Sequence, residues 1–281
     1  MERLAQPAPE ATNPITTRRV IVGFVVAAVG LACMVLPWTF YLLVLVIALT
    51  CLYELNLLCE VKGQPLEYPI AVLGVFAYAL FASLGMLHKW EGVLIAGIVV
   101  AAFAIGMYGE ESGYFARTAN TLLAVLYIGK LLTYFIFIRQ VPNVGLAWTV
   151  YAVVLIALTD ILGMLIGTAI GRHRLTRISP KKTVEGSVGA VVVVTAIGAL
   201  LTWVPQLHLQ WWQGACLGLL TCIAAQAGDL VESSLKRDAG VKDTGSVIQG
   251  HGGMLDRFDS YLFGGTAFFA TLHLIGILQV R

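Results

Sequence analysis

The chain has 281 residues, of which 58% are hydrophobic and only 12% are charged, and its formal net charge is +2. A soluble domain of this length would carry about 25% charged residues, and the mean hydropathy here is +0.84. This composition excludes an ordinary soluble globular domain and predicts a polytopic membrane protein. The five cysteines lie in or beside apolar runs, so we interpret them as packing residues. We expect no nucleic-acid partner.

Apolar runs close to the ~20 residues that a helix needs to cross a bilayer recur along the chain. They predict an all-α, helical bundle of about nine transmembrane helices. The first residues, 1–18, are polar and predict a tail without a signal peptide. The spans are expected at about residues 20–36, 38–58, 68–87, 92–108, 119–138, 144–171, 187–204, 212–231 and 258–279.

The placement of Lys and Arg predicts the orientation, because these residues concentrate in cytoplasmic loops. With the N-terminus cytoplasmic, all but Lys89, Lys130, Arg139 and Arg281 fall on the cytoplasmic side. Two cytoplasmic loops, residues 172–186 and 232–257, carry nine of the fourteen cytoplasmic Lys and Arg residues. Both loops fall in a C-terminal region, residues 143–281, which follows a set of N-terminal spans, residues 19–142.

The stretch from Asp229 to Asp259 combines acidic, basic and glycine residues. If the helix of span eight continues past the membrane edge, then one helical face holds Asp229, either Glu232 or Ser233, and Lys236. Further on, a glycine-rich turn precedes a helix with Asp256 and Asp259 in its first turns. The free backbone N–H groups at such a helix start can bind phosphate. Carboxylate oxygens beside Lys and Arg side chains are suited to bind Mg²⁺ together with a polyphosphate. Acidic residues that merely stabilise the helix dipole are the alternative.

The other charged loop contains Ser179-Pro180-Lys181-Lys182. Ser followed by Pro is typical of a helix start, which predicts both lysines in a first helical turn. Cations are disfavoured at that position unless an anion is bound. The ordinary enrichment of cations in cytoplasmic loops is the alternative interpretation.

Besides Asp229 and Asp259 near span ends, three charged residues lie within predicted spans. Asp160 stands roughly 16 Å below Gly171 along its helix, and a carboxylate in a membrane is a functional candidate by default. Gly163, Gly167 and Gly171 recur on a neighbouring face and predict close helix contact. Glu54 is expected near the cytoplasmic headgroup level. Lys130 is expected to pair within the bundle or to extend toward the membrane surface.

The stretch "SSLKRDAGVKDTGSVIQGHGGMLDRFD" resembles the signature of the CDP-diacylglycerol synthases, also called phosphatidate cytidylyltransferases. The segments Gly228-Asp229-Leu230 and Ser179-Pro180-Lys181-Lys182-Thr183 are also similar to that family, as is the acidic residue Asp160 in a membrane helix. The resemblance covers about a third of the chain, 160–259. Three features depart from the family pattern. Gln249 changes the rigidity of its loop, whereas Val184 and residues 161–164 concern headgroup recognition more than the chemistry.

The resemblance implies that CTP and phosphatidic acid react to give CDP-diacylglycerol and pyrophosphate. It implies a homodimer in the inner (plasma) membrane, among membrane lipids, with the active site facing the cytoplasm. It implies Mg²⁺ bound by Asp229 and Asp256, together with a second metal ion, for which a monovalent ion is a candidate. The catalytic residues that it implies are Asp229, Lys236, Arg237, Lys242, Asp243, His251, Asp256, Arg257 and Asp259. The substrate-binding residues that it implies are Asp160, Ser179, Lys181, Lys182, Thr183, Ser233, Gly252 and Gly253.

Two other functions remain open at the level of sequence. A CTP-dependent polyprenol or lipid kinase would transfer the γ-phosphate and release CDP. An ion-coupled transporter would use Asp160 and Lys130 as coupling groups, but it does not need a cluster of phosphate-binding residues on one face.

Overall fold

The computed structural model describes residues 30–108, 113–201, 207, 209–244 and 253–278. Within these ranges the regular structure is helical, apart from one isolated β-bridge between Arg174 and Thr183. The predicted all-α class is therefore confirmed for this part of the chain. The helices are α2 (Pro37–Val61), α3 (Tyr68–Ser83), α4 (Leu87–Gly106), α5 (Tyr114–Ala124), η1 (Val125–Lys130), α6 (Leu131–Arg139), α7 (Gly145–Ile170), α8 (Val184–Leu200), α9 (Trp211–Asp238) and α10 (Leu255–Leu274).

Five helical segments in the described residues are long and apolar enough to cross a membrane. They are α2, α4, the continuous segment Tyr114–Arg139, α7 and α9. The helices α3 and α8 are apolar but shorter, and α10 carries three charged residues in its first turns. Each predicted span from 38–58 onward coincides with one of these helices, whereas most of the first span and the tail lie outside the described residues.

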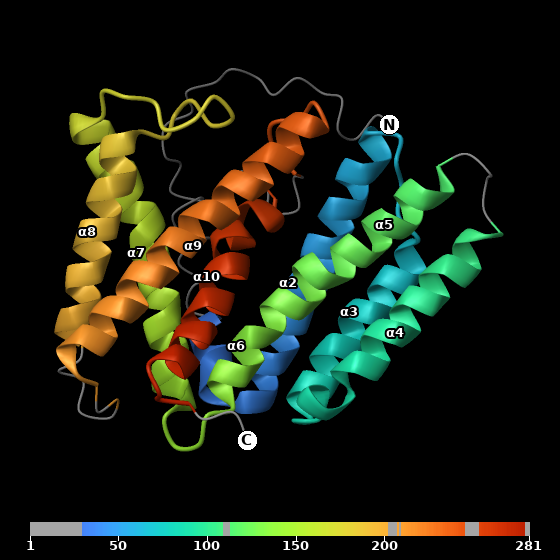
Figure 1. Cartoon of the computed structure of the whole chain (residues 1–281), viewed down its shortest axis with the longest axis horizontal. Helices are drawn as coiled ribbons and strands as arrows, with labels where there is room; N and C mark the ends of the chain where they lie inside the picture. Colours follow the sequence, from blue (N-terminus) through green and yellow to red (C-terminus); the bar gives the residue numbers. More distant parts are fainter. Residues whose placement is uncertain (1–29, 109–112, 202–206, 208, 245–252, 279–281) are drawn as a thin grey trace.

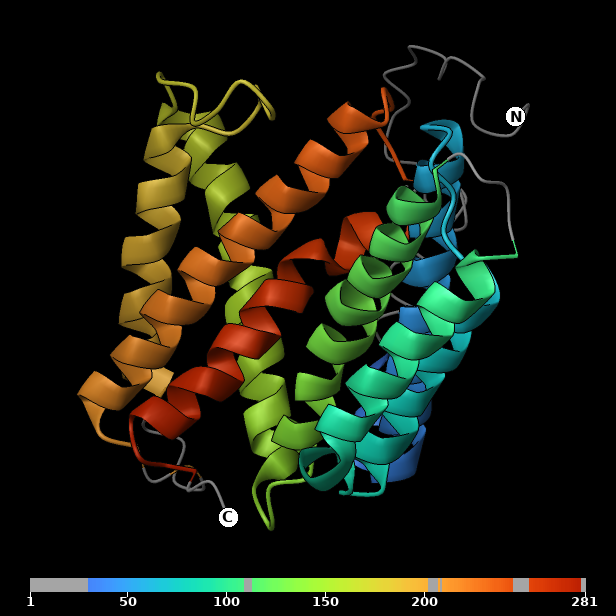
Figure 2. The ribbon, with the colours of Figure 1, turned by 45° about the vertical axis from the view of Figure 1, so that its right-hand side comes forward.

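The helices form two groups joined by α10 (Figures 1 and 2). On one side α7, α8 and α9 pack against one another, and on the other side α2 to α6 form a second group. Helix α10 contacts α9, α7, α6 and α2. Glycines permit this central position, because a Cβ atom on Gly264 would meet Ile156 of α7 and one on Gly265 would meet the ring of Phe135 on α6.

The loop before α8 and the end of α9, which belong to the two predicted charged loops, meet at one end of the bundle, the upper end in Figure 1. The Nε atom of Arg237, near the end of α9, donates to the carbonyl of Ile178 over 3.4 Å. At the same end, Lys62 after α2 forms an ion pair with Asp238 of α9. The fold therefore brings both loops and the end of the N-terminal group together.

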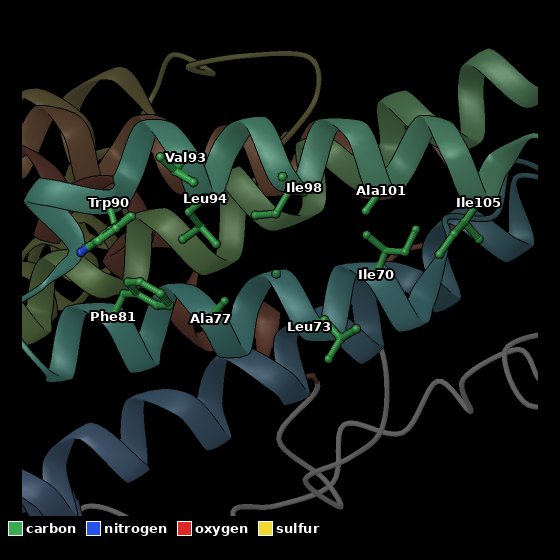
Figure 3. A pocket seen from close by; sticks show the side chains of 12 residues that line it. Ile70, Leu73, Ala77, Phe81, Trp90, Val93, Leu94, Ile98, Ala101 and Ile105 are labelled. Carbon is green, nitrogen blue, oxygen red and sulfur yellow. The ribbon is translucent and has the colours of Figure 1, made fainter.

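A groove of about 410 Å³ lies between α3 and α4, at the far side of the second group. Its walls are apolar side chains such as Leu73, Phe81, Trp90 and Ile98, as Figure 3 shows. It offers no charged group to a nucleotide, so the chemistry must be sought elsewhere.

Candidate active site

A second hollow, of about 520 Å³, lies among α7, α8, α9 and the loop that precedes α8. We call it the polar pocket. Six of the predicted site residues line it: Asp160, Ser179, Lys181, Lys182, Thr183 and Asp229. Residues from three separate parts of the chain thus face one space, which combines two ammonium groups with two carboxylates.

Close packing of α7 on α8 forms one wall of the polar pocket. A Cβ atom on Gly186 of α8 would lie 2.6 Å from the Gly163 carbonyl oxygen and 2.9 Å from the Gly167 Cα atom. These glycines let the two backbones touch, as the spacing in the sequence predicts. A larger residue would separate the helices and change the shape of the pocket.

The loop before α8 differs from the prediction. Ser179-Pro180 does not start a helix, since the N–H of Lys182 donates to the Ser179 carbonyl over 3.1 Å in a turn. Helix α8 begins at Val184 instead, and the hydroxyl of its N-cap residue Thr183 accepts from the N–H of Gly186 over 3.1 Å. The prediction was wrong because Thr183 is the better-placed cap. Lys181 and Lys182 therefore lie in the turn, outside the unfavourable end of the helix dipole.

Carboxylates from three helices gather beside this turn. Asp229 of α9 forms an ion pair with Lys182 and accepts from the Ser233 hydroxyl over 3.4 Å, which confirms the predicted helical face. Asp160 of α7 accepts from the Ser260 hydroxyl of α10 over 3.0 Å. Asp259 is buried, and Asp229 lies within electrostatic range of both Asp160 and Asp259.

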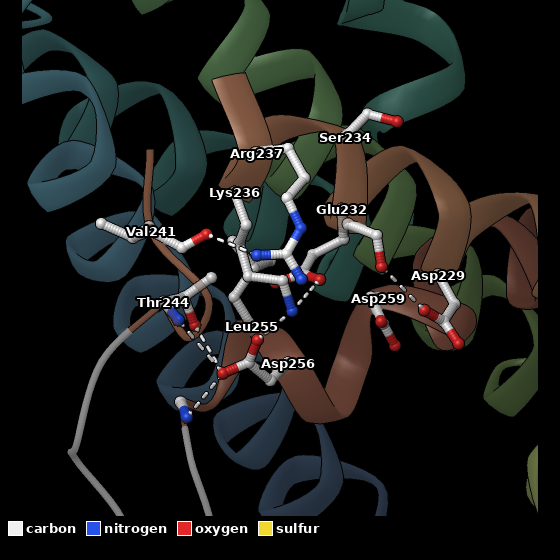
Figure 4. Close-up of polar contacts among 12 residues, drawn as sticks. Asp229, Glu232, Ser234, Lys236, Arg237, Val241, Thr244, Leu255, Asp256 and Asp259 are labelled. Carbon is white, nitrogen blue, oxygen red and sulfur yellow. Dashed lines mark hydrogen bonds and ion pairs between the residues drawn. The ribbon is translucent and has the colours of Figure 1, made fainter. Parts of the chain in front are cut away.

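A second polar group, the Asp256 cluster, adjoins the first and consists of Glu232, Lys236, Thr244, Gly253 and Asp256 (Figure 4). The Lys236 Nζ atom lies 2.5 Å from Glu232 Oε2 and 2.6 Å from Asp256 Oδ1. The other Asp256 oxygen accepts from the Thr244 N–H, the Thr244 hydroxyl and the Gly253 N–H over 3.2, 3.1 and 2.9 Å. Lys236 thereby links α9 to the first turn of α10.

The carboxylates of these two groups could hold an additional cation. Glu232 is fully buried, and Lys182 and Lys236 form the ion pairs with Asp229, Glu232 and Asp256. Hard oxygen donors of this kind suit Mg²⁺. Within the described residues, however, no three His, Cys, Asp or Glu side chains converge on one point. A metal ion would have to replace Lys182 and Lys236 as the partner of Asp229 and Asp256.

The remaining predicted residues lie at the edges of this region. Arg237 contacts the carbonyls of Ile178 and Val241, and Lys242, Asp243 and Arg257 are exposed. Gly253 is buried against Thr244. His251 and Gly252 lie outside the described residues.

The structure shows the partners of two charged residues in predicted spans. Glu54 is fully buried, and its carboxylate accepts from Thr244, Met254 and Leu255; its level relative to the headgroups stays a prediction. A lone acid in an apolar run was the only signal in the sequence that could have found it. Lys130 pairs within the bundle, as one of its two predicted alternatives required, and its partner is Glu91 of α4.

Comparison with known proteins agrees with this geometry. The chain matches the model of the cytidylyltransferase family over residues 17–275. It is 33% identical to the phosphatidate cytidylyltransferase of Bacillus subtilis over 88% of this chain and 93% of the relative. It is 31% identical to that of Staphylococcus epidermidis over 84% of this chain and 87% of the relative. The corresponding Synechocystis protein is 51% identical over 42% of this chain and 41% of its own length. The chain belongs to the cytidylyltransferase family.

Proposed function

We propose that this protein transfers the cytidylyl group of CTP to phosphatidic acid and so makes CDP-diacylglycerol and pyrophosphate. A phosphate oxygen of the lipid attacks the α-phosphorus of CTP, and the bond from that phosphorus to the oxygen bridging to the β-phosphate breaks. The observation that carries the proposal is the polar pocket, with Lys181, Lys182 and Asp229, beside the Lys236–Asp256 pair at one end of a bundle of mainly apolar helices. The names of the relatives agree with it.

The reaction joins two anions, so the site must neutralise charge and hold the reactants in line. Lys181 and Lys182 line the pocket and are the groups that we assign to phosphate. Lys236, Arg237, Lys242 and Arg257 supply further positive charge at the same end of the bundle. The lipid phosphate is already ionised near neutral pH, so no general base is needed.

We further propose that Asp229 and Asp256 hold Mg²⁺ with the nucleotide, and that a second metal ion, for which a monovalent ion is a candidate, binds nearby. The metal would neutralise part of the negative charge on the phosphates of CTP. The assignment is supported by the hard oxygen donors of Asp229 and Asp256, which lie in adjoining polar clusters and suit Mg²⁺. Asp160, Asp243 and Asp259 would add negative charge around the ion, and His251, Gly252 and Gly253 would contribute from the glycine-rich segment.

The lipid would enter the polar pocket from the side. Met164 and Thr168 on α7 line the pocket and are also exposed on the outer face of the bundle. Their apolar neighbours Ile161 and Leu165 are exposed as well. An acyl chain could therefore remain in the bilayer while its phosphate reaches Lys182 and Asp229.

We propose the same membrane arrangement that the sequence predicts. It comprises about nine spans, a cytoplasmic N-terminus and a homodimer in the plasma membrane, with the catalytic residues in the region 143–281. The two charged loops lie at one end of the bundle, which supports placing that end toward cytoplasmic CTP.

The test is an assay of the purified protein with phosphatidic acid, Mg²⁺ and CTP labelled at the α-phosphate. We expect label to enter the lipid and pyrophosphate to be released. Asp229→Asn should abolish this transfer, whereas the matched change Asp238→Asn, at an exposed position on the same helix, should preserve it. Chelation by EDTA should stop turnover and added Mg²⁺ should restore it.

Two outcomes would overturn the proposal. Label that stays in soluble CDP, together with a newly phosphorylated lipid, would identify a kinase. An absence of CTP turnover by the wild-type protein with phosphatidic acid would reject the enzyme assignment.

A further inference from the structure

Glu54 on α2 is a buried carboxylate that belongs to the N-terminal group of helices and yet reaches the Asp256 cluster. Its side chain is fully buried. One oxygen, Oε1, accepts from the Met254 N–H over 2.8 Å, and the other, Oε2, accepts from the Leu255 N–H over 2.7 Å. The Thr244 hydroxyl lies 3.1 Å from Oε2. These contacts join residues about 200 positions apart.

The contacts of Glu54 cap the start of α10. The N-cap residue of that helix, Met254, makes no capping hydrogen bond with its own side chain. The Glu54 carboxylate instead accepts from two N–H groups at the helix N-terminus, where the helix dipole favours negative charge. A buried carboxylate is costly without such donors. Glu54 therefore depends on the N–H groups at the start of α10, and those N–H groups depend on Glu54 as their acceptor.

Glu54 also shares its partners with Asp256. The Thr244 hydroxyl lies 3.1 Å from Glu54 Oε2 and 3.1 Å from Asp256 Oδ2. Gly253 donates to Asp256, and a Cβ atom on Gly253 would collide with both the Thr244 hydroxyl and the Glu54 carboxylate. The space between the two carboxylates is therefore filled by one threonine hydroxyl and one glycine.

We propose that Glu54 is a positioning residue for the cytidylyl transfer. It holds Thr244 and the first turn of α10 in place, so that Asp256 faces Lys236 of α9. Glu54 does not touch substrate in this role, since it acts through Thr244 and the Met254–Leu255 backbone. The inference rests on the proposed function, because Asp256 is assigned there to the reaction.

The first test compares Glu54→Gln with Glu60→Gln in the full-length protein. Glu60 is an exposed acid on the same helix, where it accepts from Asn56, so it controls for loss of a charge on α2. The described partners of the Glu54 carboxylate are all donors. In Glu54→Gln the amide NH₂ would therefore face another donor, and this repulsion would displace the start of α10. We expect kcat to fall ~10- to 100-fold, as is typical for groups that orient catalytic ligands. The KM for CTP should change much less, because Lys181 and Lys182 are untouched.

The second test uses Thr244, so that the inference can be judged even if Glu54→Gln does not fold. Thr244→Val removes the shared hydroxyl with little change of shape and should lower kcat, whereas Thr244→Ser keeps the hydroxyl and should retain activity. In a folded Glu54→Gln protein, adding Thr244→Val should cost less than it does in wild type, because both changes disturb one network.

The outcomes separate this inference from the proposed function. If the wild-type protein lacks cytidylyl transfer, the proposed function is wrong, and the positioning role of Glu54 is wrong with it. If wild type is active and Glu54→Gln retains its kcat, or if Thr244→Val is as active as Thr244→Ser, the positioning role is wrong. The positioning role would also be wrong if Glu54→Gln lowered only the amount of folded protein, while kcat per folded molecule stayed at the wild-type value.

Discussion

The Nζ atom of Lys236 lies 2.6 Å from Asp256 Oδ1 and so connects the charged-loop end of α9 with the first turn of α10. The two residues are 20 positions apart in the sequence. The same ammonium group also neutralises Glu232, which is fully buried. This relationship makes Lys236 a structural residue as well as a candidate for phosphate binding.

Replacing Lys236 by methionine should therefore lower stability as well as activity. The change leaves two carboxylates without their ammonium partner, and breaking a buried ion pair costs on the order of 3 kcal/mol. Lys62→Met is the control, because its ion pair with Asp238 is exposed and is worth at most about 1 kcal/mol. Thermal melting in detergent should show a clearly lower Tm for Lys236→Met than for Lys62→Met; equal values would contradict the structural role.

The lysines of the loop before α8 should govern CTP binding. Lys181→Ala and Lys182→Ala each remove a charged donor from the polar pocket, and such a hydrogen bond is worth ~1.5–3 kcal/mol. We expect the KM for CTP to rise roughly 10- to 100-fold, with a smaller change in kcat. Lys89 lies over the ring of Trp90 in the N-terminal group of helices, so Lys89→Ala should leave the KM for CTP unchanged. An unchanged KM in both loop variants would remove these lysines from the nucleotide site.

The contact between α7 and α8 should tolerate no side chain at Gly186. Gly186→Ala places a methyl group within 3 Å of two backbone atoms of α7, so we expect a lower Tm and a higher KM for CTP. Gly92→Ala on α4 meets nothing within 4 Å and should be neutral or stabilise by about 0.4–1 kcal/mol. If both variants melt alike, the close helix contact is not needed for stability.

The ion pair between Lys130 and Glu91 should matter for stability alone. Both side chains are about one-third exposed and lie away from the polar pocket. Lys130→Met should lower the Tm, and the added change Glu91→Gln should recover part of the loss, because it removes the unpaired carboxylate. Cytidylyl transfer per folded molecule should stay at the wild-type level. A loss of transfer in the stable double variant would instead give this pair a functional role.

The sequence by itself determined those features that depend on local periodicity. Apolar runs of span length predicted the helices, and helical spacing alone was enough to place Asp229, Ser233 and Lys236 on one face of α9. The glycines of α7 likewise predicted a close helix neighbour, although the neighbour itself, α8, followed only from the fold.

Only the tertiary structure decided which distant residues meet. The partnership of Glu54 with Thr244 and the start of α10, and that of Asp160 with Ser260, bridge 100 positions or more. The sequence misplaced Lys181 and Lys182 because the competition between Ser179 and Thr183 as helix cap depends on the α7–α8 contact. Helical periodicity is a local property, whereas a buried carboxylate is stabilised by whichever donors the folded chain brings to it.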